Sequence, residues 1–368
     1  MITEALAAGL ERDGRTVITC NDVESAELMV EHLRPSHIVA DIRLTGQFGF
    51  EGLDFIHYVN RHAPESRVIL ISGDGAEALQ LEASRRGAVA YLQKPFDVQV
   101  LDSTLDLISS SALSSTAELA SIIRVPLLEE LLISDSLRPF FQPIVKLDGS
   151  RSIFGYEALA RFRTDSPLRN PEVLFKYAAR KQRVCELEFA CIGKAMEAGG
   201  ALTYGGALMF INVHPDVFGS GALFQRTLVS HARQRGVSLE RVVLEITEQS
   251  SLSGTSAVLK AIQELRDLGV RFAFDDVGVA YSHLPLIGDV RPSFLKISQH
   301  FGTGFETDPT RRKIVMNLQS LARDFNCELI LEGVENESTA KAAADLGIPL
   351  GQGFFFGHPA DASAFINE

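Results

Sequence analysis

The chain contains no tryptophan, only four cysteines among 368 residues, and no excess of basic side chains. Cys20, Cys185, Cys191 and Cys327 lack the paired spacing of a zinc site, which favours a reducing, cytoplasmic setting. The net charge of −12 argues against a nucleic-acid binder, because such proteins normally present a basic face. The longest apolar runs, such as Ala207–Val213, fall short of the roughly 18 residues that span a bilayer. We therefore expect neither nucleic acid polymers nor membranes among its partners.

Length and composition favour two globular domains. A domain usually takes about 100 to 200 residues, and 46% apolar residues are enough for two sizeable cores. An anionic ligand of so acidic a protein needs local positive charge between itself and the chain. Metal ions are the obvious source of that charge.

The first 110 residues alternate helices with short apolar strands. The expected strands are Thr16–Thr19, His37–Ala40, Arg67–Ser72 and Ala88–Leu92. Their near-continuous apolar runs are typical of a parallel sheet buried on both faces. The pattern predicts a doubly wound α/β domain over residues 1–110.

A serine-rich stretch, Ser109–Thr116, interrupts this alternation. We assign residues 111–126 to a linker and expect helix over Ala117–Ile133. Residues 127–368 then supply roughly 240 residues, the usual size of a (β/α)₈ barrel, and eight short strands can be found among their helices.

Polar side chains lie in or just after each of the eight strands, where barrel chemistry gathers. They are Gln142, Glu157, Asn212, Glu245, Asp275 with Asp276, Lys296, Glu332 and Gln352. Any one of them alone could be a solvated strand end or a helix cap. Five acids beside one lysine would repel one another unless cations were present. Carboxylate and amide oxygens suit Mg²⁺ or Mn²⁺, and the adjacent Asp275 and Asp276 could serve two ions about 3.5–4 Å apart.

Seven segments, in order, resemble the EAL domain family of cyclic-di-GMP phosphodiesterases. They are FQPIV…GYEALAR (Phe141–Arg161), FINVHP around Asn212, LEITE (Leu244–Glu248), FAFDD (Phe272–Asp276), FLKI (Phe294–Ile297), LEGVE (Leu331–Glu335) and GQGFFFGHP (Gly351–Pro359). The tripeptide alone is not specific, since Glu4-Ala5-Leu6 and Glu77-Ala78-Leu79 also occur. The resemblance covers about two-thirds of the chain and implies an EAL-type (β/α)₈ barrel.

The resemblance also implies roles for the site residues, in a reaction that opens cyclic-di-GMP to linear pGpG. Two ions, Mg²⁺ or Mn²⁺, would be held by Glu157, Asn212, Glu245, Asp275 and Asp276. Lys296 and Glu332, with Glu157, would be the catalytic side chains that act around the attacking water. The substrate would be bound by Gln142, Leu159, Arg161 and Gln352, and Glu248 would brace the loop after Asp275.

Two departures from the family's pattern leave a second function open. The loop usually written DDFGTGYSS reads DDVGVAYSH over Asp275–His283, and Ser298 replaces the aspartate two residues after Lys296. A catalytically weak or inactive module that binds cyclic-di-GMP and signals is therefore the alternative. Glycoside hydrolysis by paired carboxylates is less consistent, because no tryptophan offers a sugar platform.

The N-terminal half resembles a response-regulator receiver domain. Asp41 matches the phosphoacceptor, Ser72 and Lys94 its phosphate-binding partners, and Tyr91 the switch aromatic. The strand that carries the acidic Mg²⁺-binding pair has no counterpart, and Asn21-Asp22 is better explained as a helix N-cap. We expect poor phosphorylation in isolation and a role in homodimerisation or in docking a histidine kinase or other signalling partner.

Overall fold

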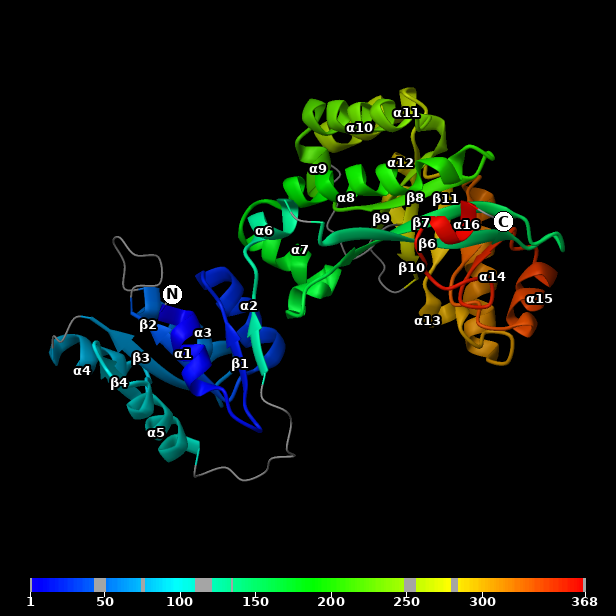
Figure 1. The fold of residues 1–368 in the computed structure, drawn as a ribbon. Coiled ribbons are helices and arrows are strands. Elements are labelled where there is room, and N and C mark those ends of the chain that lie inside the picture. Colours follow the sequence, from blue (N-terminus) through cyan, green and yellow to red (C-terminus); the bar gives the residue numbers. More distant parts are fainter. Residues whose placement is uncertain are drawn as a thin grey trace. The chain divides into compact units, whose positions relative to one another are not determined.

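The computed structural model describes residues 2–42, 51–73, 77–109, 121–133, 135–247, 256–278 and 284–366. These residues form two compact units (Figure 1). One consists of residues 1–136 with 162–182, and the other of residues 137–161 with 183–368. Within the described ranges, no helix has both the length and the apolar character needed to cross a membrane.

The first unit contains the expected alternation of helices and strands. Its elements are α1 (Ile2–Leu10), β1 (Thr16–Thr19), α2 (Val23–Leu33), β2 (His37–Asp41), α3 (Glu51–His62), β3 (Arg67–Ser72), α4 (Glu77–Arg85), β4 (Ala90–Gln93), α5 (Val98–Ser109), β5 (Ser121–Arg124), α6 (Leu128–Ile133), the 3₁₀ turn η1 (Pro167–Arg169) and α7 (Pro171–Arg180). Strands β2, β3 and β4 form a parallel sheet in that order.

Strand β3 shows why this sheet is covered on both faces. Val68 and Leu70 pack in a cluster with Ile56 and Val59 of α3, whereas Ile69 packs with Leu101 of α5. Alternate residues of a strand point to opposite faces, so an unbroken apolar run serves two helical layers. The doubly wound, receiver-like architecture is confirmed.

The expectation of helix throughout Ala117–Ile133 is wrong. Residues Ser121–Arg124 form β5, which pairs in parallel with β1 from Thr16↔Ser121 to Thr19↔Arg124. Helix α6 begins only at Leu128. The two consecutive isoleucines of β5 are β-branched and favour a strand, and the edge of β1 provides the backbone partners.

The second unit is a closed eight-stranded barrel. Its strands are β6 (Leu137–Lys146), β7 (Ile153–Phe162), β8 (Leu208–Val213), β9 (Val242–Thr247), β10 (Arg271–Val277), β11 (Phe294–Ile297), β12 (Glu328–Leu331) and β13 (Leu350–Gln352). Its helices are α8 (Val184–Gly199), α9 (Asp216–Gly219), α10 (Ala222–Arg235), α11 (Ser256–Asp267), α12 (Leu284–Val290), α13 (Gln299–Gly302), α14 (Pro309–Asp324), α15 (Glu337–Asp345) and α16 (Ser363–Ile366), with 3₁₀ turns η2 (Gly200–Thr203) and η3 (Leu239–Arg241). The barrel fold that the sequence predicted is therefore confirmed.

The first barrel strand runs against its neighbour β13, with Gln352 opposite Ile144. A tight turn at Gly149, which has φ +89°, joins β6 to β7, and the Lys146 amide donates to the Ser152 carbonyl. An antiparallel strand presents its early residues where parallel strands present their late ones. Gln142 therefore reaches the same end of the barrel as residues near the ends of the other strands.

The barrel interior is filled by one apolar layer. It consists of Ile144, Leu208, Phe210, Val243, Ala273, Phe294, Ile330 and Leu350, with Phe154 packed against it. The alternate residues of the same strands, such as Met209, Leu244 and Phe272, pack outward in a separate cluster with helical residues. This two-residue period decides which side chains face the barrel axis.

Candidate active site at the barrel mouth

On six barrel strands, a polar residue lies two positions further along the chain than a residue of the interior apolar layer. The pairs are Phe210 and Asn212, Val243 and Glu245, Ala273 and Asp275, Phe294 and Lys296, Ile330 and Glu332, and Leu350 and Gln352. Because side chains repeat every two residues, the strands aim all six of these polar groups along the barrel axis above the apolar layer. The sequence-predicted residues are thus brought together.

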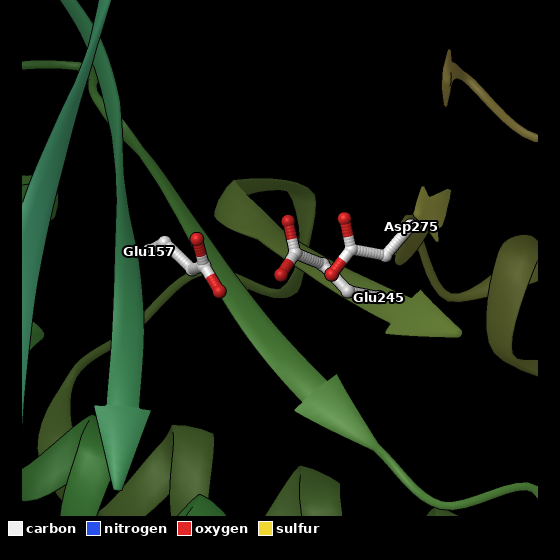
Figure 2. Close-up of side chains that lie close together, drawn as sticks. All are labelled: Glu157, Glu245 and Asp275. Carbon is white, nitrogen blue, oxygen red and sulfur yellow. The ribbon is translucent and has the colours of Figure 1, made fainter. Parts of the chain in front are cut away.

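Three carboxylates converge from the strands β7, β9 and β10. Glu157, Glu245 and Asp275 each offer an oxygen within 4.8 Å of the others, and Figure 2 shows the three groups turned toward one another. All three residues are buried. Such a cluster is electrostatically unfavourable unless positive charge is close by.

Lys296 provides part of that charge. Its side chain is 0% exposed, and its Nζ lies 3.1 Å from Glu157 Oε2, 3.0 Å from Glu245 Oε1, 3.3 Å from Asp275 Oδ1 and 2.9 Å from Glu332 Oε1. One ammonium therefore faces four carboxylates. The side chains of the cluster therefore contain fewer positive groups than acidic ones.

Amide side chains hold Glu157 from two sides. Asn212 Nδ2 donates to Glu157 Oε1 at 2.8 Å, and Gln352 Nε2 donates to Glu157 Oε2 at 2.6 Å. Gln352 Nε2 also lies 3.2 Å from Gln142 Oε1, and Gln142 Nε2 donates to the Gly357 carbonyl. The network fixes the carboxylate of Glu157 in one orientation.

Glu245 is left without a hydrogen bond on either carboxylate oxygen, among the described residues. Lys296 Nζ lies 3.0 Å from Oε1, but the geometry is that of an ion pair and not of a directed hydrogen bond. A buried carboxylate with unsatisfied oxygens is costly. These oxygens, with those of Glu157 and Asp275, form a donor set suited to a hard divalent cation.

The protonation equilibria reflect burial and crowding. Burial raises the pKa of Glu245 well above its ordinary value, and the nearby Glu157 and Asp275 raise it further. Burial likewise raises the pKa of Asp275, and it raises the pKa of Glu332 to about 8. Burial also acts against ionisation of Glu157, but Lys296 and the amides of Gln352 and Asn212 outweigh it and lower its pKa.

Desolvation disfavours the charged form of Lys296, yet the surrounding carboxylates raise its pKa well above the ordinary value. The lysine therefore stays charged at the centre of the cluster. Lys296 is charged, whereas several of the carboxyl groups around it have raised pKa values. Binding of a metal ion would therefore release protons from these carboxyl groups.

An irregularity in β10 places two consecutive acids near the mouth. The pairing of β10 with β11 shifts register between Phe274 and Val277, and Asp276 has φ +54°. The Asp276 amide donates to Asp275 Oδ1 at 2.9 Å. A bulge of this kind re-aims side chains that regular alternation would send to opposite faces.

The remaining residues of interest lie near the end of β7, outside the described ranges, or at the start of α13. Leu159 and Arg161 are half-buried near the end of β7, two and four residues beyond Glu157, and Arg161 Nη1 donates to the Ala160 carbonyl. Glu248 and the altered loop residues Val279 and Ala280 lie outside the described residues. Ser298 is 4% exposed and caps α13, its hydroxyl accepting from the His300 amide.

Glu188 is a buried acid beside this site that the sequence gave no reason to single out. It lies on α8, is 2% exposed, and its Oε1 accepts from the His214 amide at 2.6 Å. His214 is two residues beyond Asn212, so Glu188 anchors the backbone that carries this amide. Burial raises the pKa of Glu188 to about 8. Helix α8 also carries Glu186 and Glu197, so the sequence does not distinguish the one glutamate that is buried.

The backbone of Gly302 packs closely against the backbone of Glu332. A Cβ at Gly302, the last residue of α13, would lie 1.8 Å from the Glu332 carbonyl oxygen. Only glycine allows this approach. The Glu332 amide also donates to the Ile297 carbonyl, one residue beyond Lys296.

The first unit carries a smaller polar site at its strand ends. Asp41, Ser72 and Lys94 lie at or just beyond the ends of β2, β3 and β4, and Lys94 Nζ forms an ion pair with Asp41. Tyr91 is half-buried on β4. Asp22 caps α2 by accepting from the Ser25 amide at 2.8 Å, as the N-cap interpretation predicted.

Comparison with known proteins identifies the two kinds of domain. The model of the EAL domain family matches residues 127–359, and the model of the response regulator receiver domain matches residues 1–106. The chain belongs to the EAL domain family and carries an N-terminal receiver domain.

Two relatives and one solved structure are similar to this chain. The chain is 24% identical over 344 residues to the cyclic di-GMP phosphodiesterase RocR of Pseudomonas aeruginosa, covering 89% of this chain and 85% of RocR. It is 27% identical to the cyclic di-GMP phosphodiesterase TpdA of Vibrio parahaemolyticus, over 58% of this chain but only 36% of TpdA. The manganese and cyclic-di-GMP complex of Klebsiella pneumoniae BlrP1 has a similar fold, with a TM-score of 0.56, 24% identity, and coverage of 63% of this chain and 58% of that one.

Proposed function

We propose that the chain hydrolyses cyclic-di-GMP to linear pGpG with the help of two divalent ions. The observation that carries this proposal is the buried cluster of Glu157, Glu245 and Asp275 around a single lysine. Relatives that are named cyclic di-GMP phosphodiesterases support the enzyme class and the substrate.

The ions would be held by Glu157, Asn212, Glu245 and Asp275, with Asp276 reaching the second. The Glu245 oxygens support this assignment, because among the described residues neither accepts a hydrogen bond and both are open to a metal ion. When bound, Mg²⁺ or Mn²⁺ supplies positive charge that stabilises the oxygens of a phosphodiester under attack. The manganese complex of BlrP1 favours testing Mn²⁺ first.

Lys296 and Glu332 would act on the attacking water. Lys296 Nζ lies 2.9 Å from Glu332 Oε1, so the ammonium fixes the orientation of this carboxyl group. Burial raises the pKa of this carboxyl group, which makes its ionised form a stronger proton acceptor. Glu332 would receive the proton of the water while Lys296 stabilises negative charge that develops nearby.

The substrate would be recognised by side chains around the mouth. Arg161 can offer a guanidinium fork to a phosphate, in place of its present bond to Ala160. Gln142 and Gln352 would contact the guanine and ribose parts through their amides, and Leu159 would pack against the ligand. Glu248 is proposed to brace the loop after Asp275.

The decisive experiment incubates the full chain with cyclic-di-GMP and Mn²⁺ or Mg²⁺ and follows pGpG by chromatography. We expect pGpG from the wild type and at least a hundredfold slower production by Glu157→Gln. Glu337→Gln, which alters an exposed carboxylate on α15, is the matched control and should match the wild type. Absence of pGpG from the wild type with either ion would exclude the hydrolytic function.

One observation favours a second function, that of a module that binds cyclic-di-GMP without cleaving it. Ser298 stands where the family's pattern has aspartate, and it serves as a helix cap instead of adding a carboxylate. Equilibrium dialysis beside the pGpG assay separates the two functions. Tight binding with no product supports the binding module.

We further propose that residues 1–110 regulate the barrel domain, residues 127–368, across the linker 111–126, through a homodimer and in the cytoplasm. Asp41, with Ser72 and Lys94, is the candidate phosphoacceptor site for a histidine kinase or another signalling partner. Incubation with acetyl phosphate and Mg²⁺, followed by intact-mass measurement, tests phosphorylation. An adduct that disappears in Asp41→Ala would show that the domain accepts phosphate without its partner.

A further inference from the structure

A cavity lies at the end of the barrel opposite its mouth. The cavity has a volume of about 580 Å³ and is lined by the start of β7, the start of β8 and the residues around the starts of β9 and β10. Along β8, Leu208 lines the cavity, Phe210 belongs to the interior apolar layer, and Asn212 lies at the mouth. The apolar layer therefore separates the two sites.

Three cations face this cavity. Lys146 at the end of the antiparallel β6, Arg241 just before β9 and Arg271 at the start of β10 all line it, and no acidic side chain does so among the described residues. This is unexpected in a chain with a net charge of −12. Basic side chains without acidic neighbours create a positive potential that attracts anions. An anionic ligand would therefore explain why three of them line one cavity.

The two arginines differ in the contacts that their guanidinium groups make with the protein. Arg241 Nη1 donates to the Gly206 carbonyl at 2.5 Å, which fixes its guanidinium in the cavity wall. No ion pair joins Arg271 to a carboxylate in the part of the chain that the structure describes, and its side chain is only half-buried. Lys146 also attracts the exposed Asp148, so the arginines carry most of the unopposed charge.

Aromatic side chains form another part of the lining. Phe154, Tyr156 and Phe365 all border the cavity, and the rings of Tyr156 and Phe365 lie 5.2 Å apart. Helix α16, which carries Phe365, lies beside β6 and β7 in Figure 1. Phe154 and Phe365 are half-buried and can offer ring surface to a planar group.

We propose that this basal cavity binds a nucleotide monophosphate. Guanidinium groups recognise phosphate oxygens by paired hydrogen bonds, and aromatic rings pack against a base. The volume falls within the range of about 300–1,000 Å³ that small-molecule sites occupy. The site is distinct from the phosphodiesterase site and does not depend on hydrolysis.

Isothermal titration calorimetry on the full chain in EDTA tests the proposal with AMP and GMP as probes. Both nucleotides should bind the wild type, while guanosine and inorganic phosphate bind at least tenfold more weakly. Arg271→Gln should weaken nucleotide binding at least tenfold. Arg312→Gln, which removes one positive charge from α14, should change it less than twofold.

Two further variants keep the outcome decisive. Arg271→Lys retains the charge without the planar fork and should weaken binding by an intermediate factor, even if the glutamine variant is unstable. Glu157→Gln, at the opposite end of the barrel, should leave nucleotide binding unchanged. The proposal is overturned if the wild type does not bind at millimolar nucleotide, if Arg271→Gln binds as the wild type does, or if inorganic phosphate binds as tightly as GMP.

Discussion

The receiver unit and the barrel unit both end parallel strands in acidic and basic side chains, yet their electrostatic balance differs. In the receiver, Asp41 and Lys94 form a partly exposed pair, with side chains 35% and 24% exposed. In the barrel, Lys296 is 0% exposed and faces four carboxylates. Water screens the first site, whereas the second must balance its charge internally or with bound cations. The same kind of strand end therefore yields a modest surface pair in one unit and a charge-deficient site in the other.

The largest difference between the two units should be in the stability lost when each lysine is replaced separately. Lys296→Met removes the one cation that four buried carboxyl groups share, so we expect the metal-free protein to lose about 3–5 kcal/mol of stability. Lys94→Met should lower stability by less than about 1 kcal/mol, because exposed pairs contribute little. Urea unfolding in EDTA measures both values. Equal losses in the two variants would contradict the comparison.

Bound cations should stabilise the barrel through its acidic cluster. Mn²⁺ at about 100 times its dissociation constant should raise the unfolding free energy by about 2.7 kcal/mol, because it binds only the folded state. Asp275→Asn should abolish most of this gain, since it removes a carboxylate from the cluster. Asp41→Asn, in the receiver, is the control and should retain it. Thermal unfolding with and without Mn²⁺ provides the measurement.

The dependence of stability on pH should report the buried acid Glu188. Its folded pKa of about 8 lies above the value of an unfolded glutamate, so the folded state retains a proton that the unfolded state releases. Its contribution to stability is complete below about pH 4.3 and is lost as the pH rises through 8, by an amount on the order of a few kcal/mol.

Glu188→Gln isolates this contribution, because the amide is neutral at every pH and can still accept from the His214 amide. The variant should lose less stability than the wild type between pH 5 and pH 9 in EDTA. Urea unfolding at a series of pH values checks this expectation. A steeper loss in the variant would show that Glu188 is ionised in the folded protein.

The smallest expected effect concerns Ser298. Ser298→Asp adds a carboxylate beside Lys296 while keeping a good helix cap, so the Mn²⁺ concentration for half-maximal pGpG production should fall by about threefold to tenfold. Ser298→Asn keeps the cap without the charge and should behave as the wild type. An unchanged metal requirement in both variants would indicate that this position does not face the ions.

Apolar strand runs and their spacing were enough to predict both architectures. The buried cores of β3 and β8 follow directly from such runs. The candidate site residues were predicted because strand ends and the family's motifs pointed to the same positions, as at Asn212 and Glu245.

Other features depend on distant partners and could not be predicted locally. Ser121–Arg124 becomes a strand only because β1, about 100 residues earlier, offers an edge. Glu188 acts through a hydrogen bond to a backbone amide 26 residues away, which no short motif records. The basal cavity combines residues from Lys146 to Ile366, so its charge is visible only after the barrel closes.

The contact between Gly302 and the Glu332 carbonyl implies a route by which a remote change could silence the enzyme. A methyl group at position 302 would have to displace either α13 or the backbone of Glu332, because it would otherwise overlap the carbonyl oxygen. Sequence variation at this glycine would therefore shift the backbone of Glu332, and with it the carboxyl group beside Lys296, without changing either side chain.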